Sequence, residues 1–303
     1  LQENHLGYYS SKYIENTNSE RYICFLNERL ALLREKKIQL HIIDVRDYHI
    51  TSSVINSIEP DYVVHLAAIA HANKSNKDPF STFDHSLRTL ENVLDAIRTK
   101  KTHLIYFSSS MVYGNFDGEA VKEDRVCNPI GIYGALKFGA EKLVIGYNQV
   151  FNLPYTIIRP SALYGERCVS RRVGQAFIEN AISGIPLTVN GDGSDSLDFT
   201  YIDDLVQGVL RCIENKNSIN QIFNITYGSA RQIKELAEIV LDNFPSSKLE
   251  CKPRDALMPE RGTLSIEKAK MLIGYDPQFP IEIGFKKYID WYKSFSKKNN
   301  SFF

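Results

Sequence analysis

Tyr133 and Lys137 stand four residues apart at the start of a predicted helix, in the stretch NPIGIYGALKFGAEKL (128–143). Four residues are about one helical turn, so the two side chains share a face. A lysine cation one turn from a phenol can lower the pKa of that phenol. Such a phenol can remove or return a hydroxyl proton while a hydride leaves or joins the same carbon. The spacing is therefore compatible with acid–base chemistry at an alcohol carbon.

A YxxxK pair alone is a weak signal, because Tyr8 and Lys12 form a second one and a solvated helix face is the commoner explanation. The context of Tyr133 differs, since YFSSSMVYGN (106–115) places three serines, at 108–110, after an apolar run. Buried hydroxyl groups need hydrogen-bond partners, so these serines either cap a turn or face a ligand. A serine that faces a ligand could hold the substrate oxygen and share its proton with Tyr133.

The elements that would position these residues alternate in type. Four apolar runs are predicted strands, at 38–45, 61–68, 103–107 and 154–160, and amphipathic segments are predicted helices, at about 19–37, 50–58, 82–100 and 134–151. Continuous apolar runs are typical of strands that are covered on both faces. This alternation predicts an α/β fold with a doubly wound parallel sheet.

Helices dominate after about residue 160, at about 171–184, 202–216, 231–244, 265–272 and 281–295, with short apolar pieces at 186–189 and 221–225. We expect a dinucleotide-binding domain over residues 1–160 and a smaller substrate-binding lobe over 161–303, with some segments returning to the sheet. A ligand would bind where this lobe meets the carboxyl ends of the strands. The serines at 108–110 fall at such an end, which favours a ligand as their partner.

The composition argues against several classes of partner. Lys and Arg number 36 and Asp and Glu number 36, so a formal charge of zero gives no electrostatic case for nucleic acid or a membrane surface. The five cysteines are widely spaced and form no CxxC pair, which disfavours a metal site or a disulfide framework and suggests a cytoplasmic setting. No apolar stretch reaches the ~18 residues of a membrane span, and we expect no signal peptide.

Six motifs in order resemble the extended short-chain dehydrogenase/reductase family: HLAAIAHANKS, YFSSSMVYGN, YGALKFGAE, IIRPSALYG, DFTYIDDLVQGV and SIEKAKMLIGYDP. Its members are NAD(P)-dependent epimerases, dehydratases, decarboxylases and reductases of nucleotide sugars, and the likeness covers nearly the whole chain. The resemblance implies a Rossmann-like doubly wound parallel sheet with a smaller C-terminal α/β substrate lobe. It also implies that Ser109 is the catalytic serine, Tyr133 the acid/base, and Lys137 the ligand of the nicotinamide ribose that tunes Tyr133.

The same resemblance implies an NAD site, with NADP not excluded because Lys12 and Ser10 could suit a 2′-phosphate. No GxxGxxG turn occurs in the chain, so we expect that about 20 residues with the first strand and the phosphate-binding glycines are missing before Leu1. The alternative is a member that has lost its pyrophosphate site. The residues expected to hold the cofactor are Glu15, Asp44, Val45, Leu66, Ala67, Ala68, Ser108, Tyr133 and Lys137.

A nucleotide diphosphate needs Arg or Lys as its partner. By resemblance, Arg172 at a loop-to-helix junction contacts the nucleotide and Arg261 contacts the diphosphate, while Ser109 and Ser110 contact the substrate. The sugar itself stays open, because three positions depart from the family pattern: Ala162 and Ser86 where Asn is usual, and Leu197 where Arg is usual.

The residues after the catalytic serine indicate the reaction. Family 4,6-dehydratases carry Asp-Glu there and decarboxylases keep a Glu, whereas this chain has Ser110 and Met111. Methionine cannot transfer a proton, which leaves C4 epimerisation or reduction of a 4-keto sugar. Residues 16–33 resemble the second-helix region of UDP-glucuronate 4-epimerases, so we favour a UDP-sugar 4-epimerase, an isomerase. A 4-ketoreductase, a 4,6-dehydratase and a non-catalytic nucleotide-sugar-binding relative stay as alternatives, and a homodimer through the helices at 82–100 and 134–151 is expected.

Overall fold

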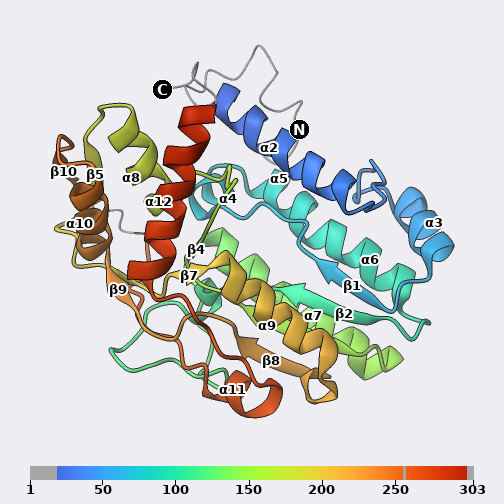
Figure 1. The fold of residues 1–303 in the computed structure, drawn as a ribbon. Coiled ribbons are helices and arrows are strands. Elements are labelled where there is room, and N and C mark those ends of the chain that lie inside the picture. Colours follow the sequence, from blue (N-terminus) through green and yellow to red (C-terminus); the bar gives the residue numbers. More distant parts are fainter. Residues whose placement is uncertain (1–18, 255–256, 299–303) are drawn as a thin grey trace.

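The computed structural model describes residues 19–254 and 257–298 of the chain, and its centre is a parallel sheet with the strand order β1-β2-β3-β8 (Figure 1). In register, Val64 pairs with Ile105, and Tyr106 pairs with Ile157. The prediction of a parallel α/β sheet is confirmed. The four strands are β1 (Tyr62–His65), β2 (His103–Phe107), β3 (Tyr155–Arg159) and β8 (Gln221–Asn224).

Helices cover both faces of this sheet, as expected for a doubly wound fold. One face packs against α6 (Thr89–Ile97) and α7 (Gly131–Phe151), with Leu104 and Ile157 fully buried between them. The other face packs against α9 (Ile202–Glu214) and α11 (Glu267–Ile273) around Phe223. Because both faces are covered, β2 and β3 are buried along their whole length, as their continuous apolar sequences predict.

The strand predicted at 38–45 is wrong for the described structure, since these residues form no strand. The side chain of Ile42 is 90% exposed, and β1 pairs only with β2 among the described strands. A parallel strand needs a neighbour to accept its backbone hydrogen bonds, and no described strand lies beside this segment. Because β1 pairs on one side only among the described strands, it is an edge strand, and Tyr62 and Val64 are exposed. Its apolar sequence predicts a strand that is buried on both faces, and this prediction is wrong for β1.

A second apolar core joins α2 (Ser19–Glu35) to α12 (Ile281–Lys298), which lie side by side (Figure 1). The ring centroid of Phe25 lies 4.9 Å from that of Trp291 and 4.9 Å from that of Phe295. The hydroxyl of Tyr22 donates a hydrogen bond of 2.9 Å to Glu179 of α8 (Val173–Ile182). The helix predicted at 19–37 therefore forms but packs in the core of the C-terminal lobe.

Most of the other predicted helices form close to their expected bounds. The helix predicted at 82–100 is divided, because the π-helical turn η1 (Asp84–Arg88) separates α5 (Pro79–Phe83) from α6. The remaining helices are α3 (Tyr48–Ile58), α4 (Ala72–Lys77) and α10 (Ile233–Asn243), with the 3-10 turns η2 (Ser110–Tyr113) and η3 (Lys216–Ser218). Short strands complete the fold: β4 (Leu163–Tyr164), β5 (Leu187–Asn190), β6 (Ser196–Leu197), β7 (Thr200–Tyr201), β9 (Arg231–Gln232) and β10 (Leu249–Lys252). Within the described ranges, no helix combines the length and the apolar character that crossing a bilayer requires.

Candidate active site

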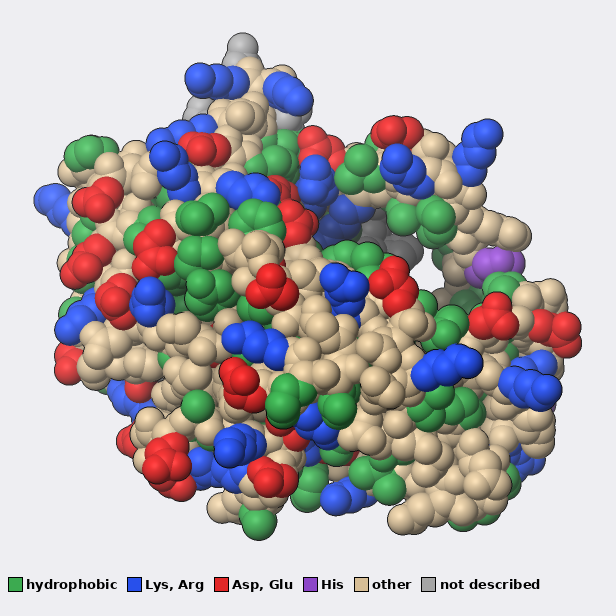
Figure 2. Space-filling model, turned by 60° about the horizontal axis from the view of Figure 1, so that its bottom comes forward, with side chains coloured by type: hydrophobic (Ala, Val, Ile, Leu, Met, Phe, Trp, Pro, Cys, Tyr) green, Lys and Arg blue, Asp and Glu red, His purple; other side chains and the backbone are tan. Residues whose placement is uncertain are grey.

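A cavity of about 1030 Å³ lies between the carboxyl ends of the central strands and the C-terminal lobe. Its walls come from Leu66 after β1, from Phe107–Ser109 at the end of β2, and from the segment that follows β3, together with Arg172 at the start of α8. The molecule is visibly hollowed on one face, with Lys and Arg side chains near the opening (Figure 2). The ligand position expected for an α/β fold therefore coincides with this cavity.

Two neighbouring segments bring Ser109, Tyr133 and Lys137 to this cavity. Ser109 caps the turn η2, where its Oγ accepts a hydrogen bond of 3.2 Å from the amide of Met111. The helix α7 presents Tyr133 in its first turn, and a hydrogen bond links the hydroxyl groups of Ser109 and Tyr133. One turn later, Lys137 Nζ donates a hydrogen bond of 2.6 Å to the carbonyl oxygen of Phe107. The structure thus brings together the three predicted catalytic side chains.

A glycine allows this close approach of α7 to the end of β2. A Cβ added at Gly134 would lie 2.8 Å from the carbonyl oxygen of Met111, which real Cβ atoms essentially never do. Any larger residue would push the first turn of α7 away from η2. Because Gly134 follows Tyr133 directly, its lack of a side chain fixes how closely the phenol approaches Ser109.

The electrostatic surroundings keep the phenol neutral and the lysine mostly charged at neutral pH. Burial raises the pKa of Tyr133, and the charges of Arg172 and Arg261, with the hydrogen bond to Ser109, oppose this rise. Burial lowers the pKa of Lys137 to about 8, against the opposing charge of Glu141. The cations that act on Tyr133 in this structure are therefore arginines, and the tuning of Tyr133 by Lys137 stays a prediction.

The predicted cofactor residues fall into two groups. Leu66, Ala68, Ser108, Tyr133 and Lys137 line the cavity. The other predicted ligands do not line it or fall outside the described residues: Asp44, Val45 and Ala67 are elsewhere in the described chain, and Glu15 lies among residues 1–18.

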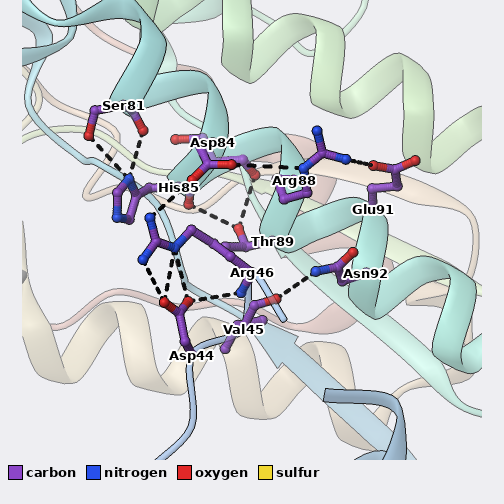
Figure 3. A network of polar contacts seen from close by, with 11 residues as sticks. Asp44, Val45, Arg46, Ser81, Asp84, His85, Arg88, Thr89, Glu91 and Asn92 are labelled. Atoms are coloured by element: carbon purple, nitrogen blue, oxygen red, sulfur yellow. Dashed lines mark hydrogen bonds and ion pairs between the residues drawn. The ribbon is translucent and has the colours of Figure 1, made fainter. Parts of the chain in front are cut away.

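Asp44 has a protein partner in this structure. Its carboxylate accepts a hydrogen bond of 2.5 Å from Arg46, which lowers the pKa of Asp44 to about 2 (Figure 3). Arg46 also binds Asp84 at 3.0 Å, so the carboxylate is part of a surface ion-pair network. The small side chains at the strand ends and the Tyr133–Lys137 pair fit the nicotinamide end of a dinucleotide. The adenine role of Asp44 stays a prediction.

The predicted substrate arginines lie at the cavity with different partners. The Nε of Arg261 is buried and has no hydrogen-bond partner among the described residues. Burial, followed by the charge of Arg172, lowers the pKa of Arg261 to about 10. Arg172 donates a hydrogen bond across the cavity to the carbonyl oxygen of Ala70. A guanidinium whose buried Nε has no partner among the described residues is suited to an anionic ligand, whereas Ser110 is buried outside the cavity wall.

The structure adds cations that the sequence reasoning missed. Arg254 lines the cavity and binds Asp195 through its Nε at 2.9 Å and 3.1 Å. Lys74 and Lys77 reach the wall from α4, a helix that was not predicted. The only sequence signals were the lysines in HANKSNK and the position of Arg254 seven residues before Arg261.

Basic side chains outnumber acidic ones around the cavity. Anionic ligands are favoured by such a lining, because a cleft with one sign of charge concentrates counter-ions. Seven lysines and arginines line the wall against two carboxylates: Arg29, Lys74, Lys77, Lys137, Arg172, Arg254 and Arg261 against Asp78 and Asp195.

The sequence is similar to those of known proteins. The model of the NAD dependent epimerase/dehydratase family matches residues 6–226. A putative UDP-glucose 4-epimerase of Methanocaldococcus jannaschii is 30% identical over 83% of this chain and 83% of its own length. A UDP-glucuronate 4-epimerase of Thermodesulfobacterium geofontis is 27% identical over 92% of this chain and 87% of its own length.

Solved structures agree as well. The crystal structure of UDP-glucuronic acid 4-epimerase from Bacillus cereus in complex with UDP-glucuronic acid and NAD matches with a TM-score of 0.81 and 27% identity, over 88% of this chain and 86% of that one. The Rossmann-like fold inferred from the motifs is therefore confirmed. The chain belongs to the NAD dependent epimerase/dehydratase family.

Proposed function

We propose that this protein is an NAD-dependent epimerase that inverts C4 of a UDP-sugar through a 4-keto intermediate. The observation that carries this proposal is the hydrogen bond between Ser109 and Tyr133 at a cavity that is also lined by Lys137 and by Arg261, whose buried Nε has no hydrogen-bond partner among the described residues. A proton-transfer pair and an anion-binding group then face one substrate. The relatives described above, which are 4-epimerases of UDP-sugars by name, support the same activity.

In the proposed mechanism, the residues of the chain handle the proton and the anionic groups. Ser109 holds O4 of the sugar, and Tyr133, in its phenolate form, takes the O4 proton to become a phenol and later returns that proton. Arg261 and Arg172 hold the diphosphate through charge-assisted hydrogen bonds. NAD, when bound, supplies the acceptor and then the donor of the C4 hydride. Leu66, Ala68, Ser108, Tyr133 and Lys137 would hold its nicotinamide end.

The residues that follow Ser109 favour epimerisation over dehydration. Met111 is 6% exposed and lies outside the cavity wall, as does Ser110. Neither can remove a proton from C5 while water leaves, which a 4,6-dehydratase requires. A 4-ketoreductase would use the same Ser109, Tyr133 and Lys137, so it is the second candidate, with NAD or NADP as the reductant.

Assembly and location complete the proposal. A homodimer would form through α7 and the helices of the 82–100 segment, since Val150 and Phe83 are 70% and 48% exposed there. All five cysteines are free, which suits a cytoplasmic setting. Sedimentation equilibrium tests the dimer, and a monomer at micromolar concentration would contradict it.

The activity is tested by incubating the protein with NAD and UDP-glucose or UDP-glucuronate, and following the C4 configuration by NMR. An epimerase converts the sugar without net change in NADH, a reductase consumes NAD(P)H with a 4-keto sugar, and a binding protein does neither. Tyr133→Phe should abolish conversion and retain UDP binding. Conversion at an unchanged rate by this variant would refute the assignment of Tyr133.

A further inference from the structure

Glu141 is a buried carboxylate that has no role in the mechanism above. It lies on α7 one turn after Lys137, and its side chain is 1% exposed. The hydroxyl of Ser108 donates a hydrogen bond of 2.5 Å to Glu141 Oε1. An ionised carboxylate in the core is costly unless it is paired and hydrogen-bonded, so its presence directly below the active site needs a reason.

Arg159 of β3 provides the ion-pair partner of Glu141. Its Nη2 lies 2.7 Å from Glu141 Oε2 and its Nε lies 2.9 Å from Oε1, a two-pronged contact between side chains that are 3% and 1% exposed. Arg159 also donates a hydrogen bond of 2.9 Å to the hydroxyl of Tyr113, which in turn donates one of 2.8 Å to Asn224. The carboxylate therefore ties α7, which carries Tyr133 and Lys137, to the ends of β2 and β3.

Glu141 supplies the negative charge that acts on Lys137. The Nζ of Lys137 contacts the carbonyl oxygen of Phe107 and lies 5.1 Å from the ring centroid of Tyr106. Glu141 is the carboxylate whose charge favours the protonated amine. The other titratable groups that face this region come from each neighbouring element: His65 of β1, Tyr106 of β2, Tyr133 of α7, Arg159 of β3, Lys74 and Lys77 of α4, Asp78, His85 of η1, and Arg172 before α8.

None of these neighbours can replace Glu141. His65 is buried and its pKa falls to about 3, chiefly through burial and then through the charge of Lys137, so it is neutral at pH 7. Tyr106 is a buried phenol whose pKa is raised, so it is neutral as well. Asp78 is exposed at the mouth of the cavity. A buried ammonium without Glu141 would therefore be stabilised only by a carbonyl oxygen and an aromatic ring.

We propose that Glu141 is a positioning residue for the reaction, which keeps Lys137 protonated and holds Ser108 so that Ser109 and Tyr133 meet at the cavity. It does so without contact to the substrate, through one hydrogen bond and one buried charge. The inference rests on the proposed function for its kinetic consequence. The protonation state of Lys137, however, is a property of the chain alone and can be measured without substrate.

Glu141→Gln tests the charge, because glutamine keeps the shape of the side chain and can still accept the hydrogen bond of Ser108. It also leaves Arg159 buried without a counter-charge, which can destabilise the fold by itself. The double variant Glu141→Gln/Arg159→Met removes both charges and avoids that problem. Tyr113→Phe is the matched control, since it deletes one hydrogen bond of Arg159 and leaves Glu141 and Lys137 unchanged.

Two measurements report the protonation of the Lys137 amine. The first is the pKa of its amine, obtained from ¹⁵N NMR of lysine-labelled protein with Lys137→Met to assign the signal. The second is the pH profile of kcat/KM for the epimerisation. In both glutamine variants the pKa of Lys137 should fall below that of the unmodified protein, because burial is then unopposed. A fall of one unit, from about 8, would lower the protonated fraction of Lys137, and with it kcat/KM, by about fivefold at pH 8 and by much less at pH 6.5.

The outcomes separate this inference from the proposed function. An unchanged pKa of Lys137 in the double variant, or an equal shift in Tyr113→Phe, would overturn the role of Glu141. A lowered pKa, together with an alkaline limb of the pH profile that moves to lower pH, supports it in full. A lowered pKa in a protein that epimerises no UDP-sugar would support the electrostatic role of Glu141 and refute the proposed function.

Discussion

The burial of Arg261 predicts that a bound anion stabilises this protein strongly. Its Nε is buried without a hydrogen-bond partner among the described residues, and its pKa falls to about 10. The fall from the ordinary value corresponds to roughly 3 kcal/mol. Because the folded-state pKa is the lower one, this destabilisation is present in full below about pH 10 and declines only as the pH rises further.

The perturbation that tests this reasoning is Arg261→Met, which keeps the length of the side chain and removes its charge. We expect the free energy of unfolding of the ligand-free protein to rise by up to roughly 3 kcal/mol at pH 7. We expect the affinity for UDP to fall by roughly 10- to 100-fold, since charge-assisted hydrogen bonds to the diphosphate are lost. A single substitution would thus raise the stability of the protein and weaken its binding.

The assay combines thermal unfolding with calorimetric titration of UDP. Uridine is the control ligand because it lacks the diphosphate, and its affinity should not change in the variant. Arg261→Lys is the control protein, as it keeps a charge but loses the planar guanidinium. If the ratio of the UDP and uridine affinities is the same in Arg261→Met and in the unmodified protein, Arg261 does not bind the diphosphate. If the variant unfolds more easily, the argument from desolvation is wrong.

Further predictions concern the phenol and the two cores. Tyr133→Phe should lower kcat by about 10²- to 10⁴-fold while the Kd for UDP changes little, and an unchanged kcat would exclude acid–base catalysis by Tyr133. Asp198→Asn should destabilise the fold by about 1–3 kcal/mol at pH 4 and by less at pH 7, because the carboxyl oxygens accept hydrogen bonds from the amides of Leu264 and Gly228 and the side-chain NH₂ of asparagine would face one of these donors. Since burial raises the pKa of Asp198 to about 6, its contribution to stability is present below about pH 4 and is lost as the pH rises through 6, so urea titrations should show a larger deficit at pH 4 than at pH 7. Phe25→Ala should cost about 3–5 kcal/mol in urea unfolding, and a loss below 1 kcal/mol would show that α2 contributes little to the second core.

The central sheet could be predicted because its signal is local. The runs at 103–107 and 154–160 consist of apolar residues that are buried on both faces, and both form strands in the sheet. The run at 38–45 has the same composition, yet it forms no strand. Whether an apolar segment becomes a strand depends on the presence of a neighbouring strand, and this information lies outside the segment itself.

The candidate site could be predicted in part for a similar reason. Ser109, Tyr133 and Lys137 belong to two short motifs with fixed spacing, so their meeting at the end of β2 could be anticipated. Glu141 carries no such signal, because a glutamate one turn after a lysine most often forms an exposed i,i+4 pair on a helix. Its burial is evident only when Arg159, eighteen residues later, is seen against it.

The arrangement of charges links substrate binding to the state of the phenol. Arg172 and Arg261 lower the pKa of Tyr133 in the ligand-free protein, and they are also the groups assigned to the diphosphate. A bound diphosphate would neutralise both charges and remove much of their effect on Tyr133. The cation predicted to act on the phenol in that state is Lys137, whose protonated form is favoured by the charge of Glu141. On this argument the buried carboxylate matters more in the loaded enzyme than in the free one, and its removal should affect kcat more than the affinity for UDP.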